Sequence, residues 1–219
     1  MAKGPLAGRA SAQPVTPGAG TTTRERLIDA AERLFYEDGI RATGVEAVAR
    51  AAGIAKISLY RAFDTKDDLV SAYLDRRRTA YWRQWGKLAD MHDDPRDKLL
   101  AVIDFLADRT TTPGYRGCPF MNSAIEFPDP GSPEHRSAVA MKREVHARLR
   151  ELCAPLTSEP ERLADELFLL IEGAYAAAHT LGGKDGPARS LPRAARALLA
   201  GEGLPETRTA MWEDRGRGS

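Results

Sequence analysis

Positively charged side chains gather on one expected face of residues 43–66, which read TGVEAVARAAGIAKISLYRAFDTK. The cations on this face and the acid that opposes them are Arg50, Lys56, Arg61 and Lys66 against Asp64. The whole chain of 219 residues, in contrast, carries 32 Lys and Arg against 31 Asp and Glu. A local surplus of positive charge on a nearly neutral chain is suited to binding phosphate groups, and the overall balance argues against a bulk polycation.

The spacing within this stretch predicts two short helices joined by a tight turn at Gly53, which is the geometry of a helix-turn-helix. In that motif the second helix enters the major groove of DNA, and its outer residues reach base edges. The positions expected to face inward are Val45, Val48, Ala49, Ala52, Ile54, Leu59 and Phe63. Those expected to face outward are Lys56, Ile57, Ser58, Tyr60 and Arg61. Ile57 either presses against a thymine methyl group or simply fills space.

The elements around this motif are predicted to be helices almost throughout, so the fold class is all-α. Apolar side chains recur at three- and four-residue steps, which places them on one face of each helix, and no strand-like alternation of any length occurs. A capping box at Thr43 and Glu46 is expected to start one helix, and Thr65 is expected to cap another. The expected helices cover residues 24–38, 43–53, 55–63, 66–91, a segment starting at 95, 120–127, 133–154, 159–181 and 191–200.

The composition limits the class of protein further. No window approaches about 18 consecutive apolar residues, so we expect no transmembrane helix, and no apolar segment near the N-terminus indicates a secretory signal. Two cysteines exclude a disulfide framework and favour a reducing cytoplasm. Residues 1–22 are expected to form a disordered arm and residues 205–219 a flexible tail, because neither segment has enough apolar surface to bury.

Residues 23 to 70 closely resemble the TetR family of transcriptional regulators. The resemblance rests on the helix from Arg24 to Gly39, on the run VEAVARAAGI from Val45, and on the residues Leu59, Tyr60, Phe63, Thr65, Lys66 and Leu69. It implies an N-terminal three-helix DNA-binding domain at 23–70, a connecting fourth helix, and a larger helical effector-binding and dimerisation domain at 71–204. Members of the family bind palindromic operators as dimers, usually as repressors that a small ligand releases.

The resemblance also implies roles for individual residues. The implied DNA-binding residues are Thr43, Val45, Lys56, Ile57, Ser58, Tyr60, Arg61 and Lys66. Tyr60 and Lys66 match phosphate-contacting positions, Thr43 and Val45 lie where the preceding helix meets the DNA backbone, and the other four face the bases. Ala55 departs from the family, which often has Ser there, so the recognition helix is expected to lack an N-cap side chain. Ile57 also departs from it, because a small residue is more usual at that position.

The segment after about residue 110 resembles, more loosely, a subgroup of the family's effector domains and does not name a ligand. We expect a cavity between helices, of the kind that apolar and aromatic side chains line. The residues predicted to bind an effector there are Trp85, Phe105, Cys118, Phe120, Met121, Asn122, Phe168 and Tyr175. Cys118 is either a sensor thiol, given the nearby Arg116, or a small buried thiol. The four histidines are too scattered for a metal site, and no cofactor is expected.

Together these features predict a cytoplasmic, homodimeric, ligand-responsive transcriptional regulator, a repressor released from a palindromic double-stranded DNA operator by a small apolar effector. Dimerisation is expected through the last two long helices, along the residues Leu163, Leu167, Leu170 and Ala174. The chain is not expected to be an enzyme, because it shows no nucleophile with a partnered base, no Gly-rich phosphate loop and no metal-ligand spacing. An interaction module that has lost DNA binding is the other alternative.

Overall fold

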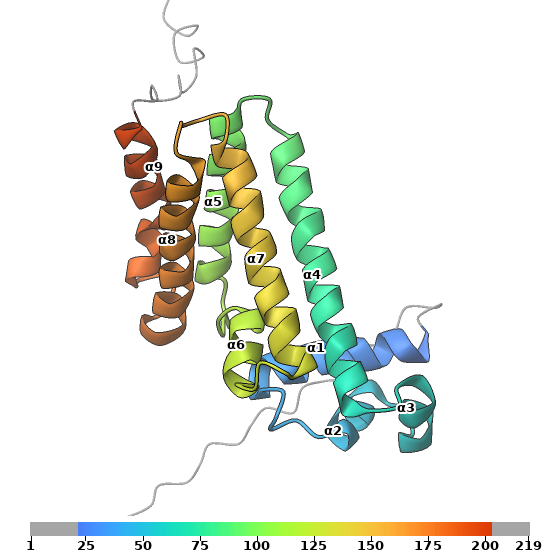
Figure 1. The fold of residues 1–219 in the computed structure, drawn as a ribbon. Helices are drawn as coiled ribbons and strands as arrows, with labels where there is room; N and C mark the ends of the chain where they lie inside the picture. The colour runs from blue at the N-terminus through green and yellow to red at the C-terminus, as the bar shows by residue number, and fades with distance from the viewer. Residues whose placement is uncertain (1–21, 203–219) are drawn as a thin grey trace, which may run out of the picture. The chain divides into compact units, whose positions relative to one another are not determined.

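The computed structural model describes residues 22–202, and every α-helix in that range is shown in Figure 1. In chain order the elements are α1 (Thr23–Asp38), α2 (Val45–Ala52), α3 (Lys56–Ala62), α4 (Lys66–Asp90), α5 (Pro95–Thr111), α6 (Pro119–Glu126), α7 (Pro133–Cys153), α8 (Pro160–Leu181), the 3₁₀ helix η1 (Pro187–Ser190) and α9 (Leu191–Gly201). No strand occurs among the described residues, so the all-α prediction is confirmed. Apart from Thr22, the predicted arm and tail lie outside the described residues.

Local capping explains where the first helices begin and end. Thr22 caps α1 through a reciprocal pair with Glu25, in which the Glu25 N–H donates to Thr22 Oγ1 at 3.2 Å and Thr22 N–H donates to Glu25 Oε2 at 2.7 Å. Thr65 and Asp68 form the same arrangement at the start of α4, as the sequence predicted for Thr65. Gly39 ends α1 with φ of 94°, a conformation that glycine adopts readily.

The capping box predicted at Thr43 and Glu46 is wrong. The N-cap of α2 is Gly44, and no side chain caps this helix. Thr43 is buried instead, and its hydroxyl donates to the carbonyl of Gly39 at 2.7 Å, so it is already used at the end of α1. The residue types of a capping box are therefore present, but Thr43 does not occupy the N-cap position that a capping box requires.

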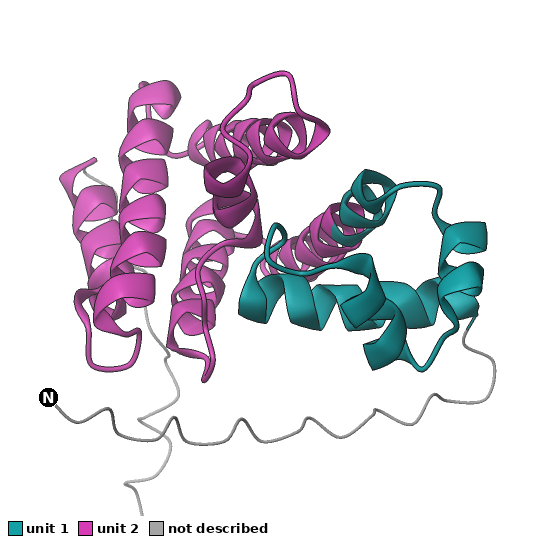
Figure 2. Ribbon diagram, turned by 90° about the horizontal axis from the view of Figure 1, so that it is seen from below, with its two compact units in different colours: residues 1–73 teal, residues 74–219 magenta. Residues whose placement is uncertain are grey.

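Two compact units divide the chain within α4, between Tyr73 and Leu74, whereas the sequence places the domain boundary at residue 70 (Figure 2). In the first unit α1 packs against both α2 and α3. The fully buried side chains there include Leu27, Leu59 and Leu69, and Phe35 meets the ring of Tyr73 edge to face at 5.6 Å between centroids. This shared core holds α2 and α3 together in one compact unit.

In the second unit α5, α7 and α8 pack around one another, with α6 against α7 and α9 against α5 and α8. The large side chains that are fully buried there include Leu99, Ile103, Leu106, Leu149, Leu163 and Leu167. Across the described range, no helix combines the length and the apolar character needed to cross a membrane.

The predicted dimer residues on α8 are wrong in part. Leu163 and Leu167 are fully buried within the protomer and Ala174 is 7% exposed, while Leu170 is half-buried. Helical periodicity shows that this face is buried but not what buries it, and here α5 and α7 do so. The side of α8 that faces outward carries Leu169, which is 70% exposed, and Gly173.

Candidate nucleic-acid interface and ligand cavity

The turn between α2 and α3 is held by backbone and side-chain hydrogen bonds. Gly53 lies in the left-handed region with φ of 64°, its N–H donates to Arg50 O at 3.1 Å, and the Ile54 N–H donates to Ala49 O at 2.9 Å. Arg26, from α1, donates from Nη2 to Ala52 O at 2.8 Å. The left-handed glycine and the two backbone bonds close α2 in the manner of a Schellman motif, and Arg26 ties this closure to α1.

The second helix of this motif, α3, has one buried and one exposed face. Leu59 and the C-cap residue Phe63 are buried against the first unit's core. Ile57 and Tyr60 are among the few large apolar side chains that lie exposed, at 64% and 46%. Lys56 and Arg61 are also exposed, whereas Ser58 is half-buried. A two-turn helix with an apolar inner face and an outer face of this kind can enter the major groove.

The remaining predicted interface residues lie in different surroundings. Val45 is half-buried at the first position of α2. Thr43 is only 4% exposed and its hydroxyl is bonded within the protein, so the predicted backbone contact by this side chain is not supported by its placement. Lys66 is half-buried and donates from Nζ to Ile40 O at 2.7 Å, which leaves two of its three N–H donors for another acceptor.

Glu46 changes the charge count of this surface. Its Oε1 lies 2.5 Å from Lys56 Nζ, and both side chains are exposed. The hydrogen bond from Lys56 lowers the pKa of Glu46 below its ordinary value, so the carboxylate is charged at neutral pH. The surplus of positive charge is therefore smaller than the sequence count suggested, because that count left Glu46 out.

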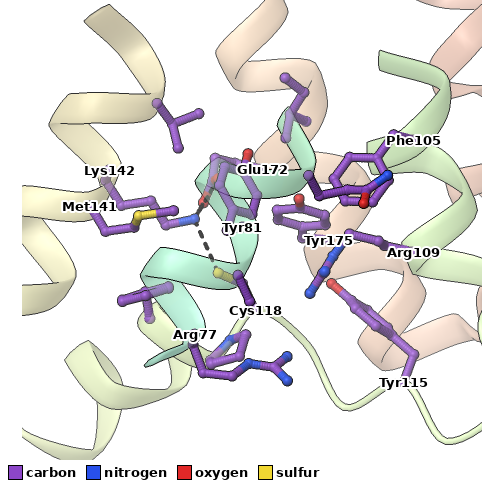
Figure 3. Close-up of a pocket in the computed structure, with 16 residues that line it drawn as sticks. Arg77, Tyr81, Phe105, Arg109, Tyr115, Cys118, Met141, Lys142, Glu172 and Tyr175 are labelled. Carbon is purple, nitrogen blue, oxygen red and sulfur yellow. Dashed lines mark hydrogen bonds and ion pairs between the residues drawn. The ribbon is translucent and has the colours of Figure 1, made fainter. Parts of the chain in front are cut away.

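A cavity of about 310 Å³ lies inside the second unit. It is large enough for a small organic molecule and is lined by residues from α4, α5, α6, α7 and α8 and from the segment before α6. Apolar residues provide much of the wall, and the polar groups labelled in Figure 3 face one another across it. The charged and phenolic lining residues are Arg77, Tyr81, Arg109, Tyr115, Lys142, Glu172 and Tyr175.

An ion pair crosses one wall of this cavity. Lys142 on α7 donates from Nζ to both carboxylate oxygens of Glu172 on α8, at 2.6 and 2.7 Å. The same ammonium group lies 3.5 Å from the sulfur of Cys118, as the dashed lines in Figure 3 show. Cys118 is half-buried, so it is not the fully buried thiol that was one of the two alternatives left by the sequence.

Four of the eight predicted effector residues line the cavity: Phe105, Cys118, Phe120 and Tyr175. The other four lie outside its lining. Trp85 is buried against Tyr81 and Trp82, and Phe168 packs on His146. Asn122 donates to Arg116 O at 2.8 Å, and Met121 is half-buried on α6. Aromatic character alone did not distinguish core residues from cavity residues.

Sequence reasoning did not identify the charged residues Arg109, Lys142 and Glu172 as cavity residues. Lys142 stands beside Met141, which is 3% exposed, so it lies at the edge of an inward face. That position could have been noticed from the sequence. In the described part of the chain, no three His, Cys, Asp or Glu side chains gather in a way that could hold a metal ion.

Comparison with known proteins agrees with this architecture. The family model for bacterial regulatory proteins of the tetR family matches residues 27–73, which contain α2, α3 and most of α1. A structure from Streptomyces avermitilis assigned to the TetR regulators is 32% identical, with a TM-score of 0.73, over 84% of this chain and 100% of that one. The chain belongs to the TetR family. It is therefore a helix-turn-helix, DNA-binding transcriptional regulator, and this family consists of regulators rather than enzymes.

Other TetR-family relatives differ in how much of their length is matched. A TetR-family transcriptional regulator from Streptomyces coelicolor is 28% identical with a TM-score of 0.79, over 83% of this chain and 96% of that chain. The HTH-type transcriptional repressor KstR2 of Rhodococcus jostii is 49% identical over 104 residues, which are 47% of this chain and 46% of that protein. An HTH-type transcriptional regulator of Mycobacterium tuberculosis is 38% identical over 80 residues, or 39% of its length. The chain thus spans less than half of these two curated relatives.

Proposed function

We propose that this TetR-family protein is a dimeric repressor that leaves a palindromic operator when a small, largely apolar molecule enters the cavity. The observation that carries the proposal is the outer face of α3, where Ile57 and Tyr60 lie exposed beside Lys56. In water these apolar side chains gain nothing by exposure, whereas in the major groove they can contact base methyl groups and the sugar-phosphate backbone. The site of action would be the cytoplasm, where the operator is.

In this proposal, different parts of the chain carry different functions. Residues 23–70 would bind DNA, and residues 71–204 would bind the effector and form the dimer. α4 contains Lys66 near its start and the cavity residues Arg77 and Tyr81 further along, so one helix takes part in both functions. A ligand that favours a different position of α4 would lower operator affinity, and linkage requires that the operator lower ligand affinity equally.

The proposed dimer forms through the outer faces of α8 and α9. Of the residues that the sequence suggested, Leu170 and Ala174 line the groove between these helices, whereas Leu163 and Leu167 do not. These helices lie side by side (Figure 1), with a shallow surface groove lined by Leu169, Gly173 and Ala177 of α8 and by Ala194 of α9. Small residues at such positions allow the backbones of two helices to approach closely, and burial of the exposed Leu169 beside them would stabilise the dimer.

The similarity to the repressor KstR2, at 49% identity over 104 residues, supports repression as the outcome of operator binding.

Selection of bound duplexes from a random DNA pool tests the DNA-binding half of the proposal. We expect a palindrome whose half-sites place the two recognition helices about 34–36 Å apart, or an operator-specific multiple. A pool that shows no enrichment, or only single half-sites, would contradict a dimeric regulator.

Replacing Lys66 by alanine should weaken binding to every duplex alike, by about fivefold to tenfold near 0.1 M salt, because one phosphate contact is lost. The slope of log affinity against log salt should fall by about one. Fluorescence anisotropy at several salt concentrations measures both. Lys87→Ala, at an exposed site further along α4, is the control. Thermal unfolding checks that loss of the Ile40 contact leaves the first unit folded. An unchanged salt slope in a folded variant would show that Lys66 does not contact a phosphate.

Replacing Glu46 by glutamine should raise affinity for all duplexes by about threefold at low salt. The carboxylate both repels phosphates and holds the ammonium of Lys56, and the variant removes both effects. The gain should shrink as salt increases. Glu37→Gln, an exposed acid on α1, provides a matched loss of charge, and an equal gain from it would show that only net charge matters.

A further inference from the structure

The charges that line the cavity are unbalanced. Three cations, Arg77, Arg109 and Lys142, face one acid, Glu172. Lys142 and Glu172 neutralise each other, because both carboxylate oxygens accept hydrogen bonds from the same ammonium group. Of the other cations in the lining, Arg109 on α5 lies beside the apolar part of the cavity.

Arg109 is the arginine whose placement is most informative. It lies half-buried in the last turn of α5, and its guanidinium carbon is 5.7 Å from the centroid of the Phe105 ring. Figure 3 shows this guanidinium group turned toward the hydroxyl of Tyr115. Among residues 22–202, no Asp or Glu forms an ion pair with it. A guanidinium group that is partly removed from water and has an aromatic ring as its neighbour is strongly stabilised by an added carboxylate or sulfonate.

The phenols around Arg109 strengthen the preference for an anion. Burial is the main cause that raises the pKa of both Tyr81 and Tyr175, so both hydroxyl groups keep their protons at neutral pH. A neutral phenol can donate a hydrogen bond to an anion, whereas a phenolate would repel it. The positive charge of Arg109 acts to lower the pKa of both tyrosines, against the effect of burial, so Arg109 interacts electrostatically with both hydroxyl groups.

The apolar side chains of the lining determine the rest of the ligand. Phe120 and Met141 are each 3% exposed and line the cavity with Phe105, Val145 and Ile171. These side chains form an apolar surface that has no group able to bind a charged part of the ligand. A molecule that suits both parts has a hydrophobic body at one end and one negative charge at the other.

We propose that the effector is a small aromatic or alicyclic acid, whose anionic group binds Arg109 and whose apolar body packs against Phe105, Phe120 and Met141. This inference rests on the proposed effector-binding function, and it narrows the expected apolar effector to one with a charged end. Arg109 is then a specificity-determining residue for the effector. It has no part in DNA binding.

Two fluorescent probes that share one hydrocarbon body test this directly. Anilinonaphthalene sulfonate carries a single sulfonate, and phenylnaphthylamine is its uncharged parent. The full-length protein should bind the sulfonate at least about tenfold more tightly than the neutral dye. Arg109→Gln should weaken sulfonate binding by about tenfold or more, because a charge-assisted hydrogen bond is lost, and should change binding of the neutral dye by less than about twofold.

Two matched variants separate a local effect from one of net charge. Arg109→Lys keeps the charge and should retain most of the preference for the sulfonate. Arg143→Gln removes one charge from an exposed position on α7 outside the cavity lining. It should leave the affinity for both dyes unchanged. Circular dichroism confirms that each variant is folded.

The proposal is overturned if the protein binds the two dyes equally, binds neither, or loses sulfonate binding as much in Arg143→Gln as in Arg109→Gln. None of these measurements contains DNA. A protein that passes them and still fails to enrich any duplex from the random pool would contradict the proposed regulator and leave the anion site standing. A protein that enriches a palindrome from the pool but fails the dye measurements would contradict the anion site and leave the proposed regulator standing.

Discussion

Replacing Gly173 by arginine is expected to convert the proposed dimer into a monomer and to weaken operator binding about 100-fold or more. A dimer gains this factor because the second half-site is bound intramolecularly, at the effective concentration that the first contact provides. An arginine on the outer face of α8 would place a long charged side chain where the partner's helix must approach. Its burial against an apolar surface would be costly.

The structure indicates that the protomer itself tolerates this change. Gly173 is exposed, and a Cβ atom built at this position meets nothing within 4 Å. It lies inside α8, where replacing glycine by a better helix former stabilises by about 1 kcal/mol. The isolated protomer should therefore be at least as stable as before.

Analytical ultracentrifugation and anisotropy with the selected operator measure the two effects. Gly86→Arg is a matched control, because Gly86 is also a helical glycine with open space around its Cβ, but on α4. The control should remain dimeric and bind DNA normally. If Gly173→Arg sediments as a dimer with unchanged operator affinity, the interface lies elsewhere on the molecule.

Substitution of Gly53 is expected to destabilise the first unit and, with it, DNA binding. The backbone there has φ of 64°, which costs a residue with a Cβ about 1–2 kcal/mol. A Cβ would also lie 3.3 Å from Arg26 Nη2, the donor that holds the end of α2. Gly53→Ala should thus lower the free energy of unfolding by about 2 kcal/mol, and Gly53→Val by more, because β-branched residues tolerate this region poorly.

Denaturant unfolding monitored by circular dichroism measures the change, and operator binding should fall with the folded fraction. Gly44 provides the comparison within the same motif. Its φ is −80°, it is the N-cap of α2, and nothing lies within 4 Å of an added Cβ. Gly44→Ser should be neutral or slightly stabilising, since serine can cap the helix. Equal losses at both glycines would show that the turn conformation is not what matters.

The sequence predicts the helices well because each buries a continuous apolar face. The start of α5 at Pro95 and the end of α8 at Leu181 are where Asp94-Pro95 and Gly182 place them. The helix-turn-helix could be located for the same reason, since Leu59 and Phe63 define its inner side and Gly53 its turn. Local spacing is sufficient information for features of this kind.

Features that depend on which helices meet could not be predicted in this way. The periodicity of Leu163 and Leu167 is the same whether a neighbouring helix or a second protomer covers them. Arg109 and Lys142 line the same cavity because α5, α7 and α8 pack around one another. Nothing in the residues next to Arg109 in sequence indicates that a cavity lies beside it.

The two cysteines differ in a way that is useful in practice. Cys153 is fully buried, and burial raises the pKa of its thiol to about 12. Cys118 is partly exposed and borders the cavity. The folded chain therefore offers a single accessible thiol to which a spectroscopic label can be attached without altering the natural sequence. That label would lie at the wall of the cavity.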